Sequence, residues 1–350
     1  MIRIGIAGIG FMGKTHFDAW KLVNGGKVSA ISTRNEKKLA GDWSAVRGNF
    51  GGTGSQVDLS DIEGFRSLDD MIASPNVDVI DICLTTPMHV DTAIKAMEAG
   101  KHVIVEKPIA LTVAEADRVI DASKSTGQRL FVGQVLRFMP EWAYIKSLME
   151  SGEYGTLNGL NIQRVISVPD WSDEMSDLAA NGGPLIDLHI HDTDFVTYLL
   201  GRPSHVFSTG RRDAGCITYV ATNYIYPDGP TVTAQSGALA SKGREFMHAF
   251  EAYFDKATLT HSVATEPESI DAADHQSGHQ RLTVYHDDGA VTFPSFEGVD
   301  GFASELQHIV DCIIADKDSD IVSGQQARDS LALVLLEGES VSSGRIVAVE

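Results

Sequence analysis

Three ionisable side chains have the types and spacing to act on a substrate. Asp187 and His191 are four residues apart, and on a helix this spacing places both side chains on one face, within reach of a shared ligand. Histidine, with an ordinary pKa of about 6.5, takes up and returns a proton near neutral pH. Lys107 follows the apolar run His102 to Val105, and an ammonium group at a strand end stabilises negative charge on a substrate oxygen. The three residues therefore predict a site that moves a proton.

A glycine-rich turn near the start of the chain predicts where a dinucleotide binds. The apolar run Ile2 to Ala7 leads directly into Gly8, Gly10 and Gly13. In a strand–turn–helix unit the first glycine forms the turn, the second lets backbone approach a pyrophosphate, and the third lets the helix pack on the strand. The alternative is a turn with a structural role only. The same turn carries two further candidates for cofactor contact, Phe11 and Met12.

Length and composition predict a globular protein of two domains. The 350 residues are 43% hydrophobic and 22% charged, which is ordinary for a globular core. Lys and Arg number 28 against 48 Asp and Glu, and the formal charge of −20 repels nucleic acid and anionic membranes. The three cysteines form no Cys-x-x-Cys pair, which favours reduced thiols. Because the first apolar run begins at Ile2 and no run approaches membrane-spanning length, we expect no signal peptide and a cytoplasmic protein.

Residues 1–133 alternate β-type runs with helical periods, which predicts a dinucleotide-binding Rossmann domain with a doubly wound parallel sheet. The glycine-rich stretch 41–64 has no period and is expected to be an excursion beyond the second strand. The expected strands are Ile2–Ala7, Lys27–Ser32, Asp78–Leu84, His102–Val105 and Leu130–Val132, and the expected helices are Gly13–Val23, Val90–Ala99 and Thr112–Ser125.

Residues 134–350 change pattern and predict an α+β domain for substrate binding and oligomerisation, with a large, open, mainly antiparallel sheet. The polar helical segment Gly182–Gly201 interrupts the strands and is expected to face the cofactor. In an alternative arrangement, the final helices of the chain pack back on the first domain. The expected strands are Leu157–Val168, Cys216–Tyr226, Thr231–Leu239, Arg244–Tyr253, Arg281–Tyr285 and Ala290–Phe293, and the expected helices lie within Gln134–Ser151, Phe302–Ala315 and Gly324–Ser343.

Six short motifs occur along the chain in a characteristic order. Besides the glycine turn they are Thr86-Pro87-x-His89, Glu106-Lys107-Pro108, Arg137-Phe138-x-Pro140, Asp187-x-x-x-His191 and Glu339-Ser340-x-x-Ser343-Gly344-Arg345. In this order they resemble the glucose-fructose oxidoreductase, inositol dehydrogenase and rhizopine catabolism (Gfo/Idh/MocA) family, from Ile2 to Val347. The resemblance implies an α/β fold whose C-terminal open sheet commonly packs against other subunits, so we expect a homo-oligomer, either a dimer or a tetramer.

The resemblance also implies an activity: hydride transfer between NAD(P) and a secondary alcohol or carbonyl of a sugar, inositol or related polyol. It implies that His191 is the base for the hydroxyl proton, that Lys107 stabilises the alkoxide, and that Asp187 orients the substrate or Lys107. For the Lys107–Pro108 peptide it suggests a cis bond, with a trans bond equally open.

Other functions stay open at this point. A nucleotide or sugar sensor on the same fold needs no proton relay, and a glycosidase that uses bound NAD transiently causes no net redox change. A metal site is a further alternative, since imidazole and carboxylate bind divalent ions. Positions 187, 189 and 191 do not converge on one helical face, so no metal is expected. The residues considered as ligands are Asp187, His189, His191, Asp192 and Asp194.

The end of the second strand bears on the choice of nicotinamide cofactor. Thr33 stands where an NAD enzyme often has Asp or Glu, and Arg34 suits bidentate contact with a 2′-phosphate. NADP is therefore favoured over NAD, although Arg34 can also stack on adenine and Glu36 lies close enough to bond the ribose. For His89, a role in starting a helix is the alternative to cofactor contact. Further cofactor candidates are Thr85, Thr86, Pro87, His89, Glu106, Lys107, Gln134 and Arg137, and candidates for a sugar-binding wall, with packing as the alternative, are Trp142, Tyr144, Asp170 and Trp171.

Overall fold

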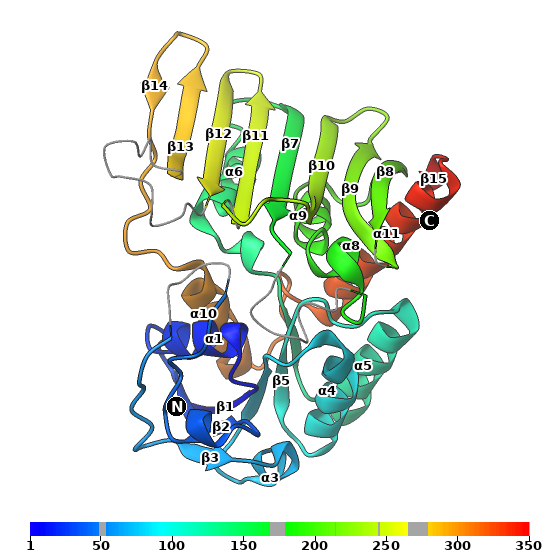
Figure 1. The fold of residues 1–350 in the computed structure, drawn as a ribbon. Helices are drawn as coiled ribbons and strands as arrows, with labels where there is room; N and C mark the ends of the chain where they lie inside the picture. Colours follow the sequence, from blue (N-terminus) through cyan, green and yellow to red (C-terminus); the bar gives the residue numbers. More distant parts are fainter. Residues whose placement is uncertain (49–53, 169–178, 214, 244–245, 265–278, 350) are drawn as a thin grey trace. The chain divides into compact units, whose positions relative to one another are not determined.

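The computed structural model describes residues 1–48, 54–168, 179–213, 215–243, 246–264 and 279–349. The chain forms two compact units, which are coloured along the sequence in Figure 1. Unit 1 consists of residues 1–138 and 300–331, and unit 2 consists of residues 139–299 and 332–350. Helix α11 (Gly324–Ser343) therefore contributes to both units.

Unit 1 contains a parallel six-stranded sheet in the order β3-β2-β1-β4-β5-β6. The order reverses direction between β1 and β4, and a sheet of this kind binds ligands outside the carboxyl ends of its strands at that point. The strands are β1 (Ile2–Ala7), β2 (Gly26–Ser32), β3 (Glu63–Phe65), β4 (Val79–Ile82), β5 (His102–Glu106) and β6 (Leu130–Gly133).

Helices cover both faces of this sheet. The connection through α1 runs one way along the sheet and the connections through α4 and α5 run the other way, so right-handed crossovers place α1 on the face opposite to α4 and α5. A reciprocal capping box of Thr112 and Glu115 begins α5. The helices of unit 1 are α1 (Phe11–Trp20), α2 (Glu36–Leu39), α3 (Leu68–Ala73), α4 (His89–Glu98), α5 (Val113–Thr126) and α10 (Gly301–Ile314), with 3₁₀ turns η1 (Thr86–Met88) and η2 (Val135–Arg137).

Unit 2 contains a nine-stranded sheet in the order β14-β13-β12-β11-β7-β10-β9-β8-β15. Its pairs are antiparallel except β7 and β10, which are parallel. Along β7, Leu160 and Ile162 are buried while Asn161 and Gln163 are exposed, the period of two that a one-sided core requires. The strands are β7 (Leu157–Ile166), β8 (His205–Asp213), β9 (Cys216–Ile225), β10 (Thr231–Ala238), β11 (Phe246–Phe254), β12 (Ala257–Ala264), β13 (His279–His286), β14 (Val291–Thr292) and β15 (Val347–Ala348).

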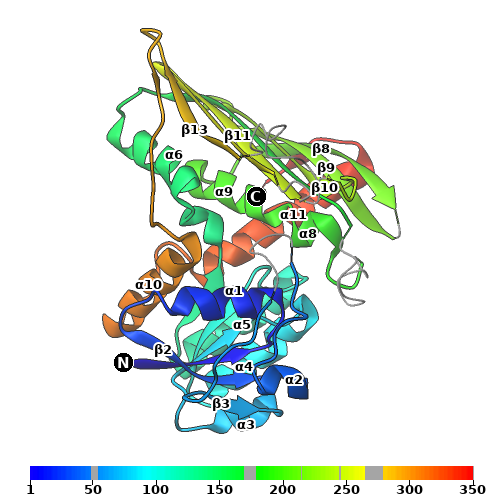
Figure 2. The same ribbon diagram turned by 60° about the vertical axis from the view of Figure 1, so that its left-hand side comes forward.

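The buried face of this sheet carries the helices of unit 2. Figure 2 shows α6 (Pro140–Ser151), α9 (Ile190–Leu200) and α11 on the same side of the strands, together with the short α8 (Gly183–Asp187). Among the described residues, no helix lies on the opposite side of the sheet in this view. The sheet therefore has one covered face and one open face.

The predicted fold class is confirmed: a doubly wound parallel sheet is followed by an α+β arrangement with a large sheet. Four strands were not predicted, namely β3, β8, β12 and the two-residue β15. Strand β3 has only three residues, the second half of β8 is exposed and polar, and β12 alternates threonine or serine with a buried set that includes His261. Strands β8 and β12 form hairpins with their neighbours β9 and β11, but their composition lacks the run of alternating apolar residues by which a strand is recognised.

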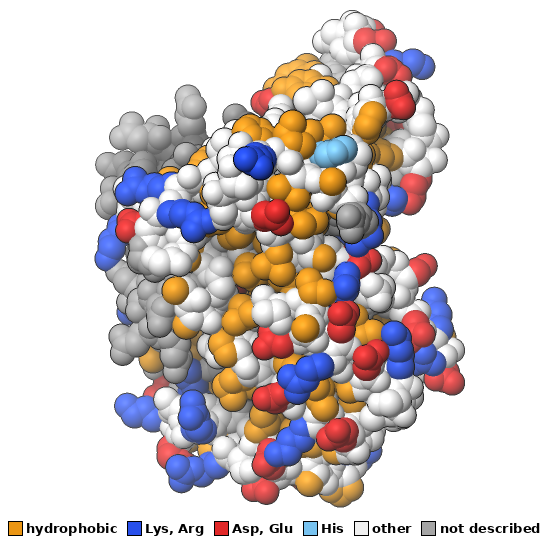
Figure 3. All heavy atoms as spheres, turned by 90° about the vertical axis from the view of Figure 1, so that its right-hand side faces the viewer, with side chains coloured by type: hydrophobic (Ala, Val, Ile, Leu, Met, Phe, Trp, Pro, Cys, Tyr) orange, Lys and Arg blue, Asp and Glu red, His pale blue; other side chains and the backbone are white. Residues whose placement is uncertain are grey.

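Charged groups of both signs are interspersed on the surface that Figure 3 shows. Lys and Arg side chains lie among Asp and Glu side chains on the described part of this face. Within the residues that were described, no helix combines the length and the apolar character that a membrane span requires.

Candidate active site

The glycine turn has the geometry that dinucleotide binding requires. Gly8 has φ +95°, in the left-handed region that favours glycine. A Cβ on Gly13 would lie 1.9 Å from the carbonyl oxygen of Gly8, so only glycine lets α1 pack this closely. A Cβ on Gly10 would meet no atom of the described residues within 4 Å. The backbone at Gly10 is therefore open to an approaching pyrophosphate at the N-terminus of α1, as such a turn requires.

The carboxyl ends of four adjacent strands meet beside this turn. Ala7 pairs with Ile82, Ile82 with Val105, and Glu106 with Gly133. The residues that follow these strands are consequently neighbours along one edge of the sheet. They include four of the predicted site positions, Gly8, Thr85, Lys107 and Gln134.

Lys107 is half-buried directly after β5. The peptide bond between Lys107 and Pro108 is cis, as the family resemblance suggested. Thr86 is buried and Pro87 exposed in η1, and Phe11 and Met12 are half-buried in the first turn of α1.

Gln134 and Arg137 are both buried, but they differ in whether their side chains have hydrogen-bond partners. Gln134 is 2% exposed, and neither its side-chain nitrogen nor its oxygen has a hydrogen-bond partner among the described residues. A buried amide without a protein partner is costly, and a polar cofactor group would satisfy it. Arg137 is buried and donates a hydrogen bond to the carbonyl oxygen of Ile321.

A buried charged cluster behind the turn was not predicted from the sequence. Nδ1 of His16 lies 3.0 Å from both carboxylate oxygens of Asp81, and Nε2 lies 2.8 Å from Oε1 of Glu106. Because both ring nitrogens face carboxylates, both must donate. Burial alone would lower the pKa of His16, but the neighbouring Asp81 carboxylate raises it well above its usual value. His16 is therefore an imidazolium that joins α1 to β4 and β5.

The same cluster has the composition of a metal site, since one potential ligand atom from each of His16, Asp81 and Cys83 lies within 4.8 Å of the others. Both ring nitrogens of His16 already donate hydrogen bonds to carboxylates, one to Asp81 and one to Glu106, so neither nitrogen offers the lone pair that a metal ligand needs. The hydrogen bonds of His16 to two carboxylates account for the cluster instead.

Glu305 of α10 lies next to this cluster and is 1% exposed. Burial, together with the nearby Glu106 carboxylate, raises its pKa to about 8. One of its oxygens, Oε1, has no hydrogen-bond partner among the described residues. Glu305 is therefore protonated at neutral pH.

In unit 2, Asp187 and His191 lie on two successive helices. Asp187 ends α8, His191 is in the first turn of α9, and both are half-buried. The expectation that they share one uninterrupted helix is corrected, because the backbone N–H groups of Leu188 and His189 both bond to Pro184 O and close the first helix.

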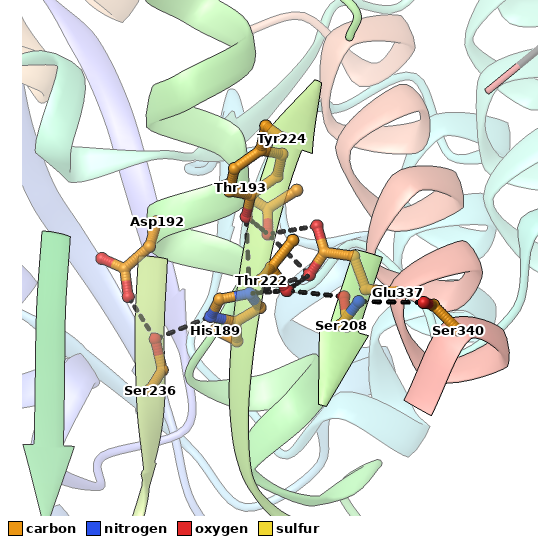
Figure 4. A network of polar contacts seen from close by, with 9 residues as sticks. All are labelled: His189, Asp192, Thr193, Ser208, Thr222, Tyr224, Ser236, Glu337 and Ser340. Carbon is orange, nitrogen blue, oxygen red and sulfur yellow. Dashed lines mark hydrogen bonds and ion pairs between the residues drawn. The ribbon is translucent and has the colours of Figure 1, made fainter. Parts of the chain in front are cut away.

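A buried polar network holds the segment between these two residues (Figure 4). Nε2 of His189 lies 2.8 Å from Oε2 of Glu337 on α11, and Nδ1 lies 2.7 Å from Oγ of Ser236 on β10. Ser236 in turn donates to Asp192 at 2.6 Å. The guanidinium of Arg164 donates twice to the other oxygen of Asp192, at 3.0 and 2.8 Å. These contacts fix the start of α9 to the sheet and to α11.

The Glu337 carboxylate also accepts hydrogen bonds from two threonines. Thr193 donates at 3.0 Å and Thr222 at 3.4 Å, while Tyr224 lies 3.0 Å from the Thr193 hydroxyl. His189 and Asp192 were among the residues considered as metal ligands, and both are engaged with protein partners.

The end of β2 is arranged around a short helix. The side chain of Asn35 accepts hydrogen bonds from Lys37 N and Lys38 N and caps α2. Arg34 is exposed, and Glu36 forms an ion pair of 2.6 Å with Arg66. The carboxylate that could have bonded an adenosine ribose is therefore paired with an arginine.

The proposed sugar-binding wall is only partly described. Trp142 is fully buried and packs edge-on against Phe195 and Phe250, which supports its alternative role in packing. Tyr144 packs against Phe296. Asp170 and Trp171 lie outside the described residues.

Comparison with known proteins finds similarity in both units. The Gfo/Idh/MocA oxidoreductase family with an NAD-binding Rossmann fold matches residues 2–134, and the Gfo/Idh/MocA C-terminal domain matches residues 142–260. The myo-inositol 2-dehydrogenase of Thermotoga maritima is 29% identical over 210 residues, which are 60% of this chain and 58% of that protein. The levoglucosan dehydrogenase of Pseudarthrobacter phenanthrenivorans is 32% identical over 220 residues, 59% of this chain and 53% of that protein. The chain thus matches less than two thirds of the length of these relatives.

Solved structures show the same fold at lower identity. The aldose-aldose oxidoreductase from Caulobacter crescentus, solved with glycerol, is 21% identical and has a TM-score of 0.78, with 99% of each chain covered.

Proposed function

The chain belongs to the Gfo/Idh/MocA oxidoreductase family, and we propose that it transfers a hydride between a nicotinamide dinucleotide and a secondary alcohol or carbonyl of a sugar, inositol or related polyol. One observation supports this most strongly. The open glycine turn follows β1, and Lys107 follows β5 on the same edge of the parallel sheet, separated from it by the end of β4, where the strand order reverses. A cation next to a dinucleotide site at this position suits a reaction that develops negative charge on oxygen.

The residues present fit a nicotinamide dinucleotide. Gly8, Gly10 and Gly13 would hold the pyrophosphate at the N-terminus of α1, and the buried amide of Gln134 has polar atoms to offer. When bound, the nicotinamide supplies the hydride acceptor. The remaining candidates for cofactor contact are Phe11, Met12, Thr33, Arg34, Thr85, Thr86, Pro87, Glu106, Lys107 and Arg137. His89 is not among them, because its buried ring lies against backbone carbonyl oxygens.

Among the nicotinamide cofactors we favour NADP. Arg34 is exposed at the end of β2, and Glu36 is paired with Arg66. An exposed guanidinium plane suits a 2′-phosphate, whereas a paired carboxylate is less able to bond a ribose hydroxyl.

The proton steps are assigned to three side chains. His191 takes the proton from the substrate hydroxyl, Lys107 holds the same oxygen and stabilises the alkoxide, and Asp187 orients the substrate. General base catalysis of this kind contributes roughly 10² to 10⁴ in rate. In the reverse direction His191 returns the proton to the alkoxide. No metal is needed in this scheme.

The substrate class is supported by the names of the relatives, which include an inositol dehydrogenase and a levoglucosan dehydrogenase. The test is a screen of purified protein with inositols, sugars and other polyols, with NADP and NAD in separate series, at alkaline pH. Formation of reduced nicotinamide by a polyol supports the proposal. Release of product from aryl glycosides without net nicotinamide reduction would instead identify a glycosidase, and dinucleotide binding without either reaction would indicate a sensor.

A further inference from the structure

Two buried histidines of unit 1 hold the residues on either side of Lys107. His16 contacts Glu106, which precedes the lysine, through Nε2 at 2.8 Å from Oε1. His89 contacts Pro108, which follows it, through Nδ1 at 2.8 Å from the carbonyl oxygen. His16 is 0% and His89 1% exposed. Neither side chain therefore has the exposure of a group that contacts a ligand directly.

The Glu106 carboxylate is held by contacts from two elements, α1 and β6. The imidazolium of His16 is also bonded to Asp81 of β4, and Trp20 donates to the same carboxylate at 2.9 Å. The Glu106 carboxylate lies against Gly133, where a Cβ would come within 2.8 Å of Oε1. The carboxylate is thus confined between α1 and β6.

The contact of His89 with Pro108 involves backbone carbonyl oxygens and no carboxylate. Nε2 of His89 lies 3.0 Å from the carbonyl oxygen of Leu84, so the ring spans two backbone segments that follow β4 and β5. Burial lowers the pKa of His89, which favours the neutral ring, and we assign the N–H to Nδ1 because its contact is the shorter. The neutral ring has one N–H and carbonyl oxygens only accept, so His89 donates to Pro108 and holds the segment after β5, while Nε2 lies near the Leu84 carbonyl oxygen without donating to it.

We propose that His16 and His89 are positioning residues for Lys107, His16 through the Glu106 carboxylate and His89 through the Pro108 carbonyl oxygen. This inference rests on the proposed catalytic role of Lys107. His16 also belongs to α1, whose N-terminus forms the glycine turn, so it ties the dinucleotide site to the lysine. His89 has no such connection to α1, and the two histidines are expected to differ in their effect on cofactor binding.

The experiment compares His89→Leu, His89→Gln and His16→Gln with the wild type. His89→Leu removes the donor to Pro108 and leaves no buried charge, and we expect kcat to fall by about 10²-fold, the typical cost of misplacing a catalytic group by about 1 Å. The Kd for the dinucleotide, measured by calorimetry, should stay unchanged. His89→Gln retains an N–H donor and should recover part of kcat. His16→Gln should weaken dinucleotide binding as well as kcat.

A second measurement does not depend on turnover. Limited acetylation of the cofactor-free protein, followed by mass spectrometry, gives the reactivity of Lys107 relative to that of Lys124, an exposed residue of α5. Loss of either histidine contact should raise this ratio severalfold, because the turn that carries Lys107 is no longer held. The control is His102→Gln, which changes a histidine at the opposite end of β5 and should alter neither kcat nor the ratio.

The outcomes are distinct. His16→Gln leaves two buried carboxylates without their partner and could unfold the protein. If circular dichroism shows that His16→Gln has lost its structure, the result for His89→Leu alone tests whether a histidine positions Lys107. A folded His89→Leu variant with wild-type kcat and wild-type acetylation of Lys107 would overturn the inference. If the wild type reduces neither cofactor with any polyol, the proposed function fails, and the acetylation ratio still decides whether the histidines position Lys107.

Discussion

Single side chains set the chemistry of the dinucleotide site, and Arg34 is the residue on which cofactor choice depends. It is exposed after β2, next to a glutamate that is paired with Arg66. We expect Arg34→Ala to raise KM for NADP by about tenfold and KM for NAD far less, since a charge-assisted hydrogen bond is worth about 1.5 to 3 kcal/mol. Steady-state kinetics with both cofactors measures this. Equal losses with NADP and NAD would show that Arg34 contacts adenine rather than a 2′-phosphate.

Glu305 gives the protein a pH-dependent stability. Burial and Glu106 raise its pKa to about 8, from an ordinary value near 4.3 in the unfolded chain. The folded state therefore holds an extra proton between these two values, and stability falls as pH rises through that range. The loss is complete above the folded pKa.

Glu305→Gln keeps the shape of the side chain without an ionisable group. We expect the variant to lose less stability than the wild type between pH 5 and pH 9, with the difference in unfolding free energy reaching a few kcal/mol at the alkaline end. Urea denaturation at a series of pH values measures this. Parallel stability curves for the two proteins would show that Glu305 is already ionised when folded.

At the scale of secondary structure, Gly10 and Gly13 are needed in the same turn for different reasons, Gly13 for packing and Gly10 for access of the dinucleotide. A Cβ at Gly13 would overlap the Gly8 carbonyl oxygen, whereas a Cβ at Gly10 would meet no atom in the part of the chain that the structure describes. Gly13→Ala should therefore lower both the melting temperature and dinucleotide affinity. Gly10→Ala should leave the melting temperature nearly unchanged and weaken dinucleotide binding, because the methyl group occupies the path of the pyrophosphate. Differential scanning fluorimetry and calorimetric titration separate the two effects.

A Gly10→Ala variant that binds the dinucleotide as tightly as the wild type would contradict this assignment of the turn.

The turn and its helix were predictable because their signal is local. The glycines, the preceding strand and the following helix occupy the first twenty residues, and the structure has β1 and α1 there. The strand ends that carry Lys107 and Gln134 were predicted for the same reason, from short β-branched runs between helical periods.

The charged cluster behind the turn was missed because its partners are distant in sequence. His16 is 65 residues from Asp81 and 90 from Glu106, and in the sequence it is one polar residue on an ordinary helix. The network around His189 has the same property, since Thr193 and Glu337 are 144 residues apart. The spacing of Asp187 and His191 was visible, but the break between α8 and α9 depends on the Pro184 carbonyl accepting two N–H groups.

For the whole molecule, the open face of the unit 2 sheet bears on assembly. Its described outward residues in the central strands include the uncharged Asn161 and Gln163 on β7 and Gln235 on β10. An open sheet face on which these central residues are uncharged suits contact with a second copy, because charged groups are depleted from the cores of such contacts. We propose that this face mediates a homodimer or tetramer.

Light scattering coupled to size exclusion tests the assembly. The wild type should elute with the mass of a dimer or tetramer. Gln163→Arg places like charges near one another in a symmetric contact and should shift the population toward the monomer, while Lys124→Met in unit 1 should not. A monomeric wild type at micromolar concentration would contradict the proposal.

The central claim is that Lys107 and His191 act on one substrate in a hydride transfer. The most direct measurement is the rate of nicotinamide reduction by Lys107→Met and His191→Asn, with the active polyol and with His205→Asn as a control at an exposed histidine of β8. The account predicts that kcat falls by roughly 10² to 10⁴ in each variant, that dinucleotide Kd stays close to the wild-type value, and that the control is fully active. Wild-type kcat in either variant would contradict it.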